Sequence, residues 1–322
     1  MSKLPSGKAG PVGRSDFFDR VNLAWETFLT SYYWAKGKRT APPPGSQTEF
    51  GQLLWRASPP LIHPRARVLV LYSPKAACTQ VMIWFLHQLG HLRAARDFHV
   101  WPHDYRDYVY RYSELYRNAY AMDFTKFKVI RVVRDPYERT VSSYRHMLGY
   151  GFRRDSLSNR LRYWNIRNTG LSFAEFLDCL ERSDLTRCNP HYRIQRHPIE
   201  DILPVHYLIN VSNEDLFKRL NEIEPEIGLP RSNIAVAAAD WLKELNWHKR
   251  PQNTLIDDGH LYTRRLTWEN ARVGPWPHYD ALLTPQARER IRRCYAVDFE
   301  AYFQEPTKAP SISPAVQLES AS

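Results

Sequence analysis

Two apolar runs constrain the fold of this chain more than any other feature of the sequence. Arg67-Val-Leu-Val-Leu-Tyr-Ser73 and Phe127-Lys-Val-Ile-Arg-Val-Val133 hold apolar residues almost without interruption. Strands that are covered on both faces of a parallel sheet have this pattern. The apolar helical segment Gln80–Leu89 lies between the runs, and Val205–Val211 is a third strand candidate. The sequence therefore predicts an α/β fold, with three α/β/α layers around a central parallel sheet.

Signals for helix starts continue this pattern towards the C-terminus. Asp135-Pro136 follows the second run, where Asp can cap a helix and Pro suits its first turn. Ser172-Phe-Ala-Glu175 has the spacing of a capping box, and Ser212-Asn-Glu-Asp215 approximates one. Thr284-Pro285 begins a last helix. These signals predict helices after the second and third strands and at the end of the main domain.

The 322 residues are enough for one α/β domain with extensions at both ends. Apolar residues within 17–34 recur at the spacing of one helical face, and the Pro-rich segment Ala41–Gly45 ends that helix. Residues 247–277, rich in Gly and Pro, predict a long loop. We expect a flexible tail over 1–15, an N-terminal helix and Pro-rich linker over 16–49, the main domain over 50–304 and a disordered tail over 305–322.

The charge balance favours anionic partners. Lys and Arg number 45 against 34 Asp and Glu, a formal net charge of +11, and 34 of the basic residues are arginines. The planar fork of Arg matches phosphate and sulfate groups. The composition therefore suits a polyanion, a nucleotide or a nucleic acid without choosing among them.

Cysteine usage and hydropathy predict a cytoplasmic protein. The four cysteines show no C-x-x-C spacing and are too few for a disulfide framework in a chain of this length. The basic N-terminus lacks the apolar core of a signal peptide. No run approaches the roughly 18 apolar residues of a membrane span. We therefore expect a reducing compartment and no transmembrane segment.

The first candidate site is the turn Tyr72-Ser-Pro-Lys-Ala-Ala-Cys-Thr79, which joins the first apolar run to the following helix. Unpaired N–H groups and the dipole at a helix start attract anions. Ala76 and Ala77 are small enough to let a ligand approach the backbone closely. Lys75 adds a positive charge, and Thr79 supplies a hydroxyl. The turn lacks the G-x-x-x-x-G-K-[ST] pattern of the Walker motif, and an ordinary tight turn with a solvated lysine is the alternative interpretation.

The second candidate site, Arg134-Asp-Pro-Tyr-Glu-Arg-Thr-Val-Ser-Ser-Tyr-Arg145, begins where the second apolar run ends. Arg134 would lie at the carboxyl end of a parallel strand, the edge at which such sheets bind ligands. Ser142 comes two helical turns after Asp135, so its hydroxyl falls on roughly the face where the helix begins. A capped helix with a surface arginine is the alternative. Two such junctions at adjacent strand ends would hold a ligand with two separated phosphate-type groups.

Together the two junctions resemble the paired signatures of sulfotransferases that use 3′-phosphoadenosine 5′-phosphosulfate. The order P-K-x-x-C-T and then V-R-D-P-x-E-R-x-V-S-x-Y is the wording of the carbohydrate (Golgi-type, family 2) branch, whereas the cytosolic branch has P-K-S-G-T-T-W. The segments Ser172–Leu177 and Asn189–Gln195 and the last helix with Tyr295 and Asp298-Phe299 are similar as well, so the resemblance covers roughly Arg67 to Phe303. It implies the P-loop-like sulfotransferase fold. Golgi-type enzymes usually begin with a membrane anchor, and this chain shows none, so a bacterial member is expected.

Carried over position by position, the resemblance implies a donor site and a reaction. The 5′-phosphosulfate would lie in the first turn, with Lys75 on the bridging oxygen, and the second junction would hold the 3′-phosphate. Sulfuryl transfer is an in-line displacement, in which Lys75 would neutralise the leaving phosphate. No metal is implied, and no cluster of His, Cys, Asp and Glu has ligand spacing. The residues expected at the donor are Pro74, Lys75, Ala76, Ala77, Cys78, Thr79, Arg134 and Ser142.

A general base must take the proton of the acceptor hydroxyl, and histidine suits this role at neutral pH. His103, in Trp101-Pro-His-Asp-Tyr105, resembles the H-x-x-[WY] placement of the catalytic histidine in heparan sulfate 6-O-sulfotransferases. His103 is therefore the expected catalytic partner of Lys75. Cys78 could be an acidified thiol, but it matches a packing position of the family. The other candidates for the base are His99, His146, His191, Asp104 and Glu138, and each histidine could instead be a hydrogen-bonded core residue.

The acceptor is expected to be a hydroxyl-bearing glycan or glycoconjugate. Arginines crowd a stretch after the second site, where sugar rings could stack on Tyr163 or Trp164; a solvated face is the alternative. A third contact to the 3′-phosphate would come from Arg264 or Arg265. The arginines of the stretch are Arg153, Arg154, Arg160, Arg162, Arg167, Arg193 and Arg196.

Two other functions compete with this interpretation. A nucleotide kinase or phosphotransferase on a related fold would need a Walker turn and a Mg²⁺-binding set, and the sequence shows neither in order. A non-enzymatic polyanion-binding module would show binding that depends steeply on salt. Nucleic acid is not the partner that we expect.

Overall fold

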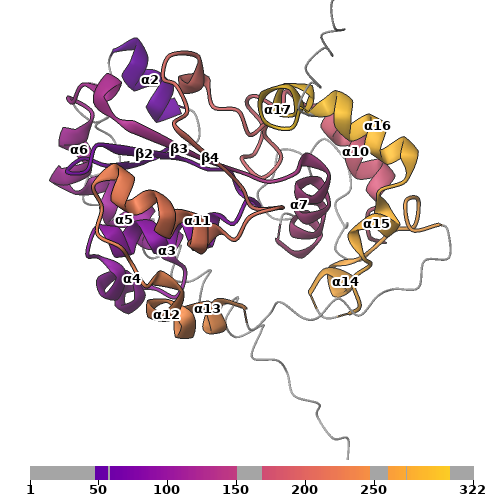
Figure 1. Ribbon diagram of the computed structural model, residues 1–322. Coiled ribbons are helices and arrows are strands. Elements are labelled where there is room, and N and C mark those ends of the chain that lie inside the picture. The colour runs from indigo at the N-terminus through magenta and orange to yellow at the C-terminus, as the bar shows by residue number, and fades with distance from the viewer. Residues whose placement is uncertain (1–47, 57–58, 151–168, 247–259, 273, 305–322) are drawn as a thin grey trace, which may run out of the picture.

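The computed structural model describes residues 48–56, 59–150, 169–246, 260–272 and 274–304. These residues form one four-stranded sheet with helices on both faces, and a second group of helices lies at one end of the sheet (Figure 1). Both predicted tails and the helix predicted over 17–34 lie outside the described residues. The domain boundaries at 50 and 304 stay predictions.

The sheet is built mainly from the apolar runs. Its strands are β1 (Leu61–His63), β2 (Val68–Leu71), β3 (Lys128–Val133) and β4 (Tyr207–Asn210), in the order β1-β2-β3-β4. β2, β3 and β4 are parallel, as the sequence predicts, and every residue of β2 is buried. β1 pairs antiparallel with β2. The sequence does not predict β1, because a strand of three residues is too short to show a period.

Helices cover both faces of the sheet, which confirms the three-layer α/β/α fold. α3 (Cys78–Gln88), α5 (Pro102–Tyr108) and α11 (Leu216–Ile223) lie on one side, and α2 (Glu49–Arg56) lies on the other (Figure 1). α3 is the predicted crossover helix, and its side chains Trp84 and Phe85 are almost fully buried. The other short helices are α4 (Leu92–Phe98), η1 (Tyr110–Tyr112), α6 (Glu114–Ala119), η2 (Phe124–Lys126), η4 (Pro198–Asp201), η5 (Glu224–Ile227), α12 (Ile234–Ala237) and α13 (Ala239–Asn246).

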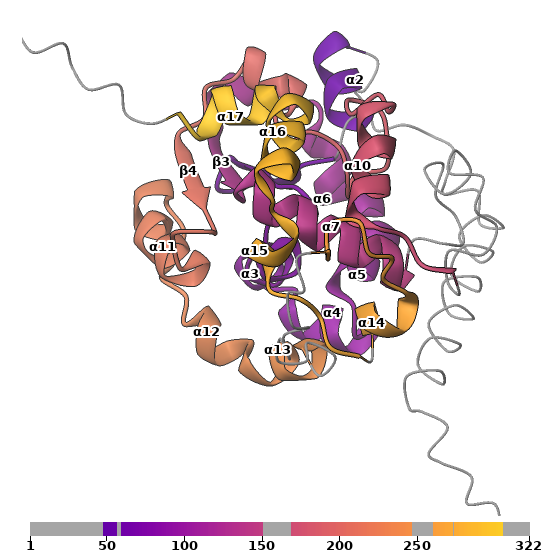
Figure 2. The same cartoon turned by 90° about the vertical axis from the view of Figure 1, so that its right-hand side faces the viewer.

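The second group of helices packs beyond the carboxyl ends of the parallel strands (Figure 1), so it faces the viewer in Figure 2. Its members are α7 (Pro136–Tyr150), α10 (Phe173–Glu181), α14 (Trp268–Arg272), α15 (Tyr279–Leu282), α16 (Pro285–Cys294) and α17 (Ala296–Tyr302). They enclose an apolar core of their own, in which Tyr144, Phe176 and Ile291 are fully buried. α14 lies within 247–277, so the long loop predicted there contains a helix of five residues; residues 247–259 lie outside the described part. The predicted last helix is divided at Tyr295 into α16 and α17.

Side-chain caps determine where several of these helices begin. The Asp135 carboxylate accepts two backbone N–H groups of the first turn of α7, at 2.8 and 3.1 Å. Ser172 and Glu175 form the predicted capping box of α10. The Thr284 hydroxyl caps α16. These three predictions are confirmed. They could be made from the sequence because each cap depends only on residues within one turn.

The capping box predicted at Ser212 is wrong. Asp215 is the N-cap of α11, and its carboxylate accepts from the backbone N–H of Lys218 at 2.8 Å. The Ser212 hydroxyl instead accepts from the backbone N–H of Asp135 and donates to the Glu138 carboxylate, each at 3.0 Å. A contact with α7 therefore replaces the local cap.

Candidate functional site

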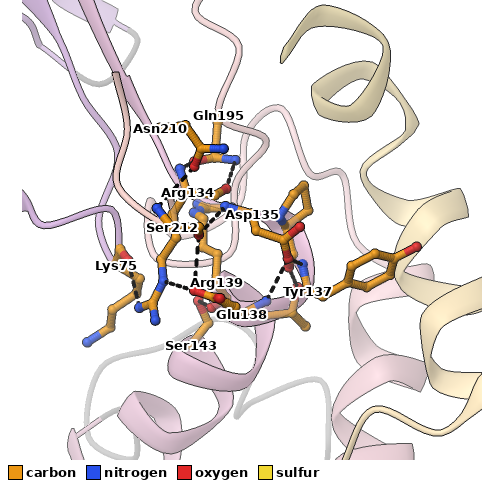
Figure 3. Close-up of polar contacts among 12 residues, drawn as sticks. Lys75, Arg134, Asp135, Tyr137, Glu138, Arg139, Ser143, Gln195, Asn210 and Ser212 are labelled. Carbon is orange, nitrogen blue, oxygen red and sulfur yellow. Dashed lines mark hydrogen bonds and ion pairs between the residues drawn. The ribbon is translucent and has the colours of Figure 1, made fainter. Parts of the chain in front are cut away.

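The two candidate turns meet at one edge of the sheet. β2 and β3 are parallel neighbours, so the turns that follow them start side by side. The Arg134 guanidinium donates from Nη1 to the backbone carbonyl of Lys75 at 3.3 Å (Figure 3). The structure thus brings Lys75 and Arg134 together, as the sequence predicts.

The first turn, residues 74–79, contains two non-glycine residues in the left-handed region. Lys75 has φ 70° and Ala77 has φ 53°. Such conformations cost free energy and cluster at ligand sites, where the surroundings enforce them. Ala76 is fully buried and α3 begins directly afterwards at Cys78. The turn therefore combines left-handed backbone with a helix start, and turns of this kind bind anions through backbone N–H groups.

Arg134 extends over the start of α7. Its Nε donates to the Glu138 carboxylate at 3.0 Å, and its guanidinium lies 5.5 Å from the ring centroid of Tyr279. Arg134 and Glu138 are only four residues apart along the chain. Ser142 follows Glu138 by four residues and lies on the same face of α7. The structure therefore places Ser142 one turn beyond the Arg134–Glu138 pair.

Gln195, to which sequence analysis assigns no role, holds the backbone of Arg134. Its Oε1 accepts from the Arg134 N–H at 3.0 Å, and its Nε2 donates to the Arg134 carbonyl at 2.9 Å. The backbone N–H of Gln195 in turn donates to the fully buried carboxylate of Asp298 at 2.7 Å. No sequence pattern marks this contact, because Gln195 lies 61 residues from Arg134 along the chain.

Arg139 joins the first turn to the segment that carries Gln195. Its side chain is only 1% exposed. The guanidinium donates to the carbonyl of Pro74 at 3.2 Å and to the carbonyl of Arg193 at 2.6 Å. Residues 193–195 therefore contact both strand ends. Arg139 links Arg193 to Pro74 after β2, and Gln195 binds Arg134 after β3 directly.

Three of the candidate histidines lie close to the first turn. His103 Nε2 on α5 is 3.4 Å from the Thr79 hydroxyl. The rings of His146 and His191 stack with their centroids 4.0 Å apart. Burial, together with the charge of Lys75, lowers the pKa of His191 to about 3 and holds the pKa of His146 well below its usual range. The stacked rings are therefore neutral at pH 7.

The remaining candidates for the base have other partners. His99 Nδ1 lies 2.7 Å from the Asp104 carboxylate. The Glu138 carboxylate pairs with Arg134. The ion pair with Arg134 disfavours the Glu138 carboxylate as acceptor of a substrate proton. The buried Asp104 Oδ2 lies near His99 Nδ1 but accepts no hydrogen bond from the described residues.

A cavity of about 300 Å³ adjoins Arg134 at the start of α7. Residues of α7, α15 and α16 line it, and Tyr279, which also lies against the Arg134 guanidinium, forms part of its wall. The cavity therefore extends the site on the side of β3.

Most of the arginine-rich stretch predicted to contact an acceptor lies outside the described residues, as do Tyr163 and Trp164. Arg193 donates to the carbonyl of Cys188 at 2.7 Å, and Arg196 pairs with Asp201 at 2.6 Å. Arg265, suggested as a third phosphate contact, pairs with Glu175 on α10. The two arginines of the stretch that the structure describes, Arg193 and Arg196, therefore bind groups that are close to them along the chain.

In the described ranges, no group of three or more His, Cys, Asp and Glu side chains is arranged to hold a metal ion. None of the helices in these ranges combines the length and apolar character that crossing a membrane requires.

Cys78, the first residue of α3, is an acidic thiol. Burial alone would raise its pKa, but a hydrogen bond with His103 and the electrostatic contributions of His103 and Lys75 lower the pKa to about 6. Burial raises the pKa of Cys294 to about 11 and that of Cys179 to about 12. At neutral pH Cys78 is therefore mostly thiolate, whereas Cys179 and Cys294 are thiols.

We expect iodoacetamide to alkylate Cys78 at neutral pH almost as fast as at alkaline pH, because a thiol with a pKa near 6 is already about nine-tenths ionised at neutrality. His103→Ala removes the hydrogen bond and should move the midpoint of the rate profile to higher pH. Timed alkylation with peptide mass spectrometry measures both, and Cys294 serves as the internal slow control. A midpoint for Cys78 near about pH 8.5, that of a free thiol, would contradict the assignment.

One comparison with known proteins identifies the chain. A family model described as the sulfotransferase family matches residues 59–304, a span that includes both strand-end turns and the whole sheet. Comparison with curated proteins and with solved structures gives no match. Because the family model covers more than half of the chain, this protein belongs to the sulfotransferase family, family 2, and is a transferase of sulfuryl groups.

Proposed function

We propose that this enzyme transfers the sulfuryl group of 3′-phosphoadenosine 5′-phosphosulfate to a hydroxyl group of a carbohydrate. The contact of Arg134 with the turn of Lys75 carries the proposal. The donor has anionic groups on its 5′ and 3′ oxygens, and two adjacent cationic strand ends offer one group to each. The resemblance of the two motifs to the carbohydrate branch supports the choice of acceptor.

In this proposal the donor spans both turns. Backbone N–H groups of residues 75–79 bind the 5′-phosphosulfate, since Lys75 and Ala77 hold the turn in the left-handed conformations that form a nest. Arg134 and Ser142 bind the 3′-phosphate. The cavity beside Tyr279 has room for part of the nucleoside.

The reaction is an in-line displacement at sulfur. The acceptor oxygen forms a new S–O bond while the S–O bond to the 5′-phosphate breaks, and 3′,5′-bisphosphoadenosine leaves. The ammonium group of Lys75 neutralises the charge that develops on the leaving phosphate. The acceptor proton passes to a base of the enzyme, and no redox partner is needed.

His103 is the base that we propose, since it lies next to Thr79 on the first turn. His191 is the alternative. Asn189 Oδ1 accepts from the backbone N–H of His191 and lies 2.8 Å from its Nδ1, so Nδ1 carries the proton and Nε2 keeps a lone pair. Because its pKa is low, the His191 ring stays neutral and is a weaker base than an ordinary histidine.

The competing functions have less support. A kinase would need the Walker turn, which residues 74–79 do not contain. A polyanion-binding module has only the net charge of +11 in its favour. A bacterial origin and a cytoplasmic location stay predictions from the sequence.

Arg134→Ala should weaken binding of 3′,5′-bisphosphoadenosine roughly tenfold to hundredfold, because it removes a charged hydrogen-bond donor from the 3′-phosphate. Isothermal titration calorimetry measures the affinity. Arg219→Ala on α11 is the matched control, since this arginine pairs with Glu222 on the surface. Unchanged binding by Arg134→Ala would remove Arg134 from the donor site.

Lys75→Ala should lower kcat by roughly a hundredfold while changing nucleotide affinity much less, because the lysine charge matters most as the leaving group forms. Initial rates with a radiolabelled donor and a panel of glycans measure turnover, and calorimetry measures affinity. Lys126→Ala, at an exposed lysine paired with Asp123, controls for loss of positive charge. Equal losses in turnover and affinity would assign Lys75 to ground-state binding alone.

His103→Ala should lower kcat by roughly a hundredfold or more and leave donor affinity unchanged, because the acceptor proton loses its base. The exposed His260→Ala provides the control. If His103→Ala keeps its full rate while His191→Ala loses activity, then His191 is the base and the assignment to His103 is wrong.

A further inference from the structure

We propose that Gln195 is a positioning residue of the donor site, which sets the place of Arg134 relative to the Lys75 turn and thereby the preference for nucleotides with a 3′-phosphate. The inference rests on the proposed function, because it takes Arg134 as the contact to that phosphate. Gln195 itself touches neither the donor nor the acceptor in this scheme.

The sheet ends just before Arg134. The last ladder bond between β3 and β4 is donated by the backbone N–H of Val211 to the carbonyl of Val133, at 3.0 Å. Beyond it, side chains replace the missing strand partners: Gln195 binds both the N–H and the carbonyl of Arg134, and Ser212 accepts from the N–H of Asp135. The carboxamide of Gln195 therefore acts as one more rung of the sheet.

A carboxamide suits this place because it offers one acceptor and one donor at its tip. Gln195 is 2% exposed, so a buried backbone group of Arg134 left without it has little access to water. A carboxylate would accept from the N–H of Arg134 but repel its carbonyl, and a thioether would serve neither group. Of these three groups, only the amide satisfies both.

Gln195 is itself held from the other side of the molecule. The carboxylate of Asp298 on α17 accepts from the backbone N–H of Gln195 at 2.7 and 2.9 Å and from that of Arg196 at 3.0 Å. Asp298 is fully buried. The backbone of Gln195 is thus held in place by a buried side chain of the second group of helices.

The same segment also contacts the Lys75 turn. Arg139 donates to the carbonyls of Arg193 and Pro74, so a rigid path runs from Arg134 through Gln195, Arg193 and Arg139 to Pro74. Together with the pairing of β2 and β3 and the contact of Arg134 with Lys75, this path sets the separation between the two cationic strand ends. A misplacement of about 1 Å in such a distance can lower the reaction rate by about two orders of magnitude.

Gln195→Met tests the proposal with a side chain of similar length that can make neither hydrogen bond. The readout is the ratio of affinities for 3′,5′-bisphosphoadenosine and for adenosine 5′-phosphate, which lacks the 3′-phosphate, measured by calorimetry. We expect the ratio to fall about tenfold, the effect of misplacing one phosphate contact. Gln88→Met is the matched control, because this amide lies at the far end of α3 and binds Glu224.

The outcomes are distinguishable. A wild-type protein that binds neither nucleotide would refute the proposed function and this inference with it. Wild-type preference for the bisphosphate, with an unchanged ratio in Gln195→Met or an equal loss of both nucleotides, would overturn the inference alone. A fall in the ratio that Gln88→Met shares would also overturn it, since general destabilisation then explains the result.

Gln195→Glu provides a second test that does not depend on how Gln195→Met folds. A protonated carboxyl can donate to the Arg134 carbonyl and accept from its N–H, as the amide does, whereas a carboxylate cannot donate. Burial at this position raises the pKa of the introduced carboxyl. Relative to wild type at the same pH, we therefore expect near-normal affinity for the bisphosphate at about pH 5 and a loss of about tenfold at about pH 8. A loss that is independent of pH would contradict the positioning role.

Discussion

The parallel pairing of β2 with β3 is the constraint on which the site depends. Leu71 lies opposite Arg131 in this pairing, so both strands end at the same edge and the turns that follow them are neighbours. An antiparallel pair would place Lys75 and Arg134 at opposite edges. The pairing is stabilised by apolar side chains buried on both faces of β2 and β3. The hydrophobic core therefore decides where the charges of the site lie.

Polar side chains from distant segments complete what the short strands leave unfinished. Gln195 continues the ladder beyond β3, Asp298 holds Gln195, and Arg139 joins the same segment to Pro74. Buried polar and charged groups are tolerated only when their partners are present. The geometry of the strand ends and the packing of the second group of helices are therefore linked.

The positive charge of the first turn shapes the chemistry of its neighbours. Burial, with this charge as a further cause, keeps the stacked rings of His146 and His191 neutral, and the hydrogen bond with His103, together with this charge, makes Cys78 acidic. An anionic donor bound at Lys75 would cancel part of this charge and raise the pKa of each group. In the proposed donor site, the same field that attracts the donor thus adjusts the proton affinity of the groups around it.

Much of the fold could be predicted from the sequence because its signals are local. Continuous apolar runs marked β2 and β3, and the caps at Asp135 and Ser172 marked α7 and α10. Hydrophobic period and capping operate within a turn or a strand, so the residues themselves display them. β1 was too short to show a period, and Ser212 gave up its local cap for a contact with Glu138 that only the folded chain allows.

The site divides in the same way. By itself the sequence determined that a lysine turn and an arginine junction each follow a buried strand. The tertiary structure alone decided that Gln195 holds Arg134 and that His103 and the His146–His191 stack gather at one turn. The reason is physical: these contacts join segments that are far apart along the chain, and their partners are chosen by how the sheet and the second group of helices pack.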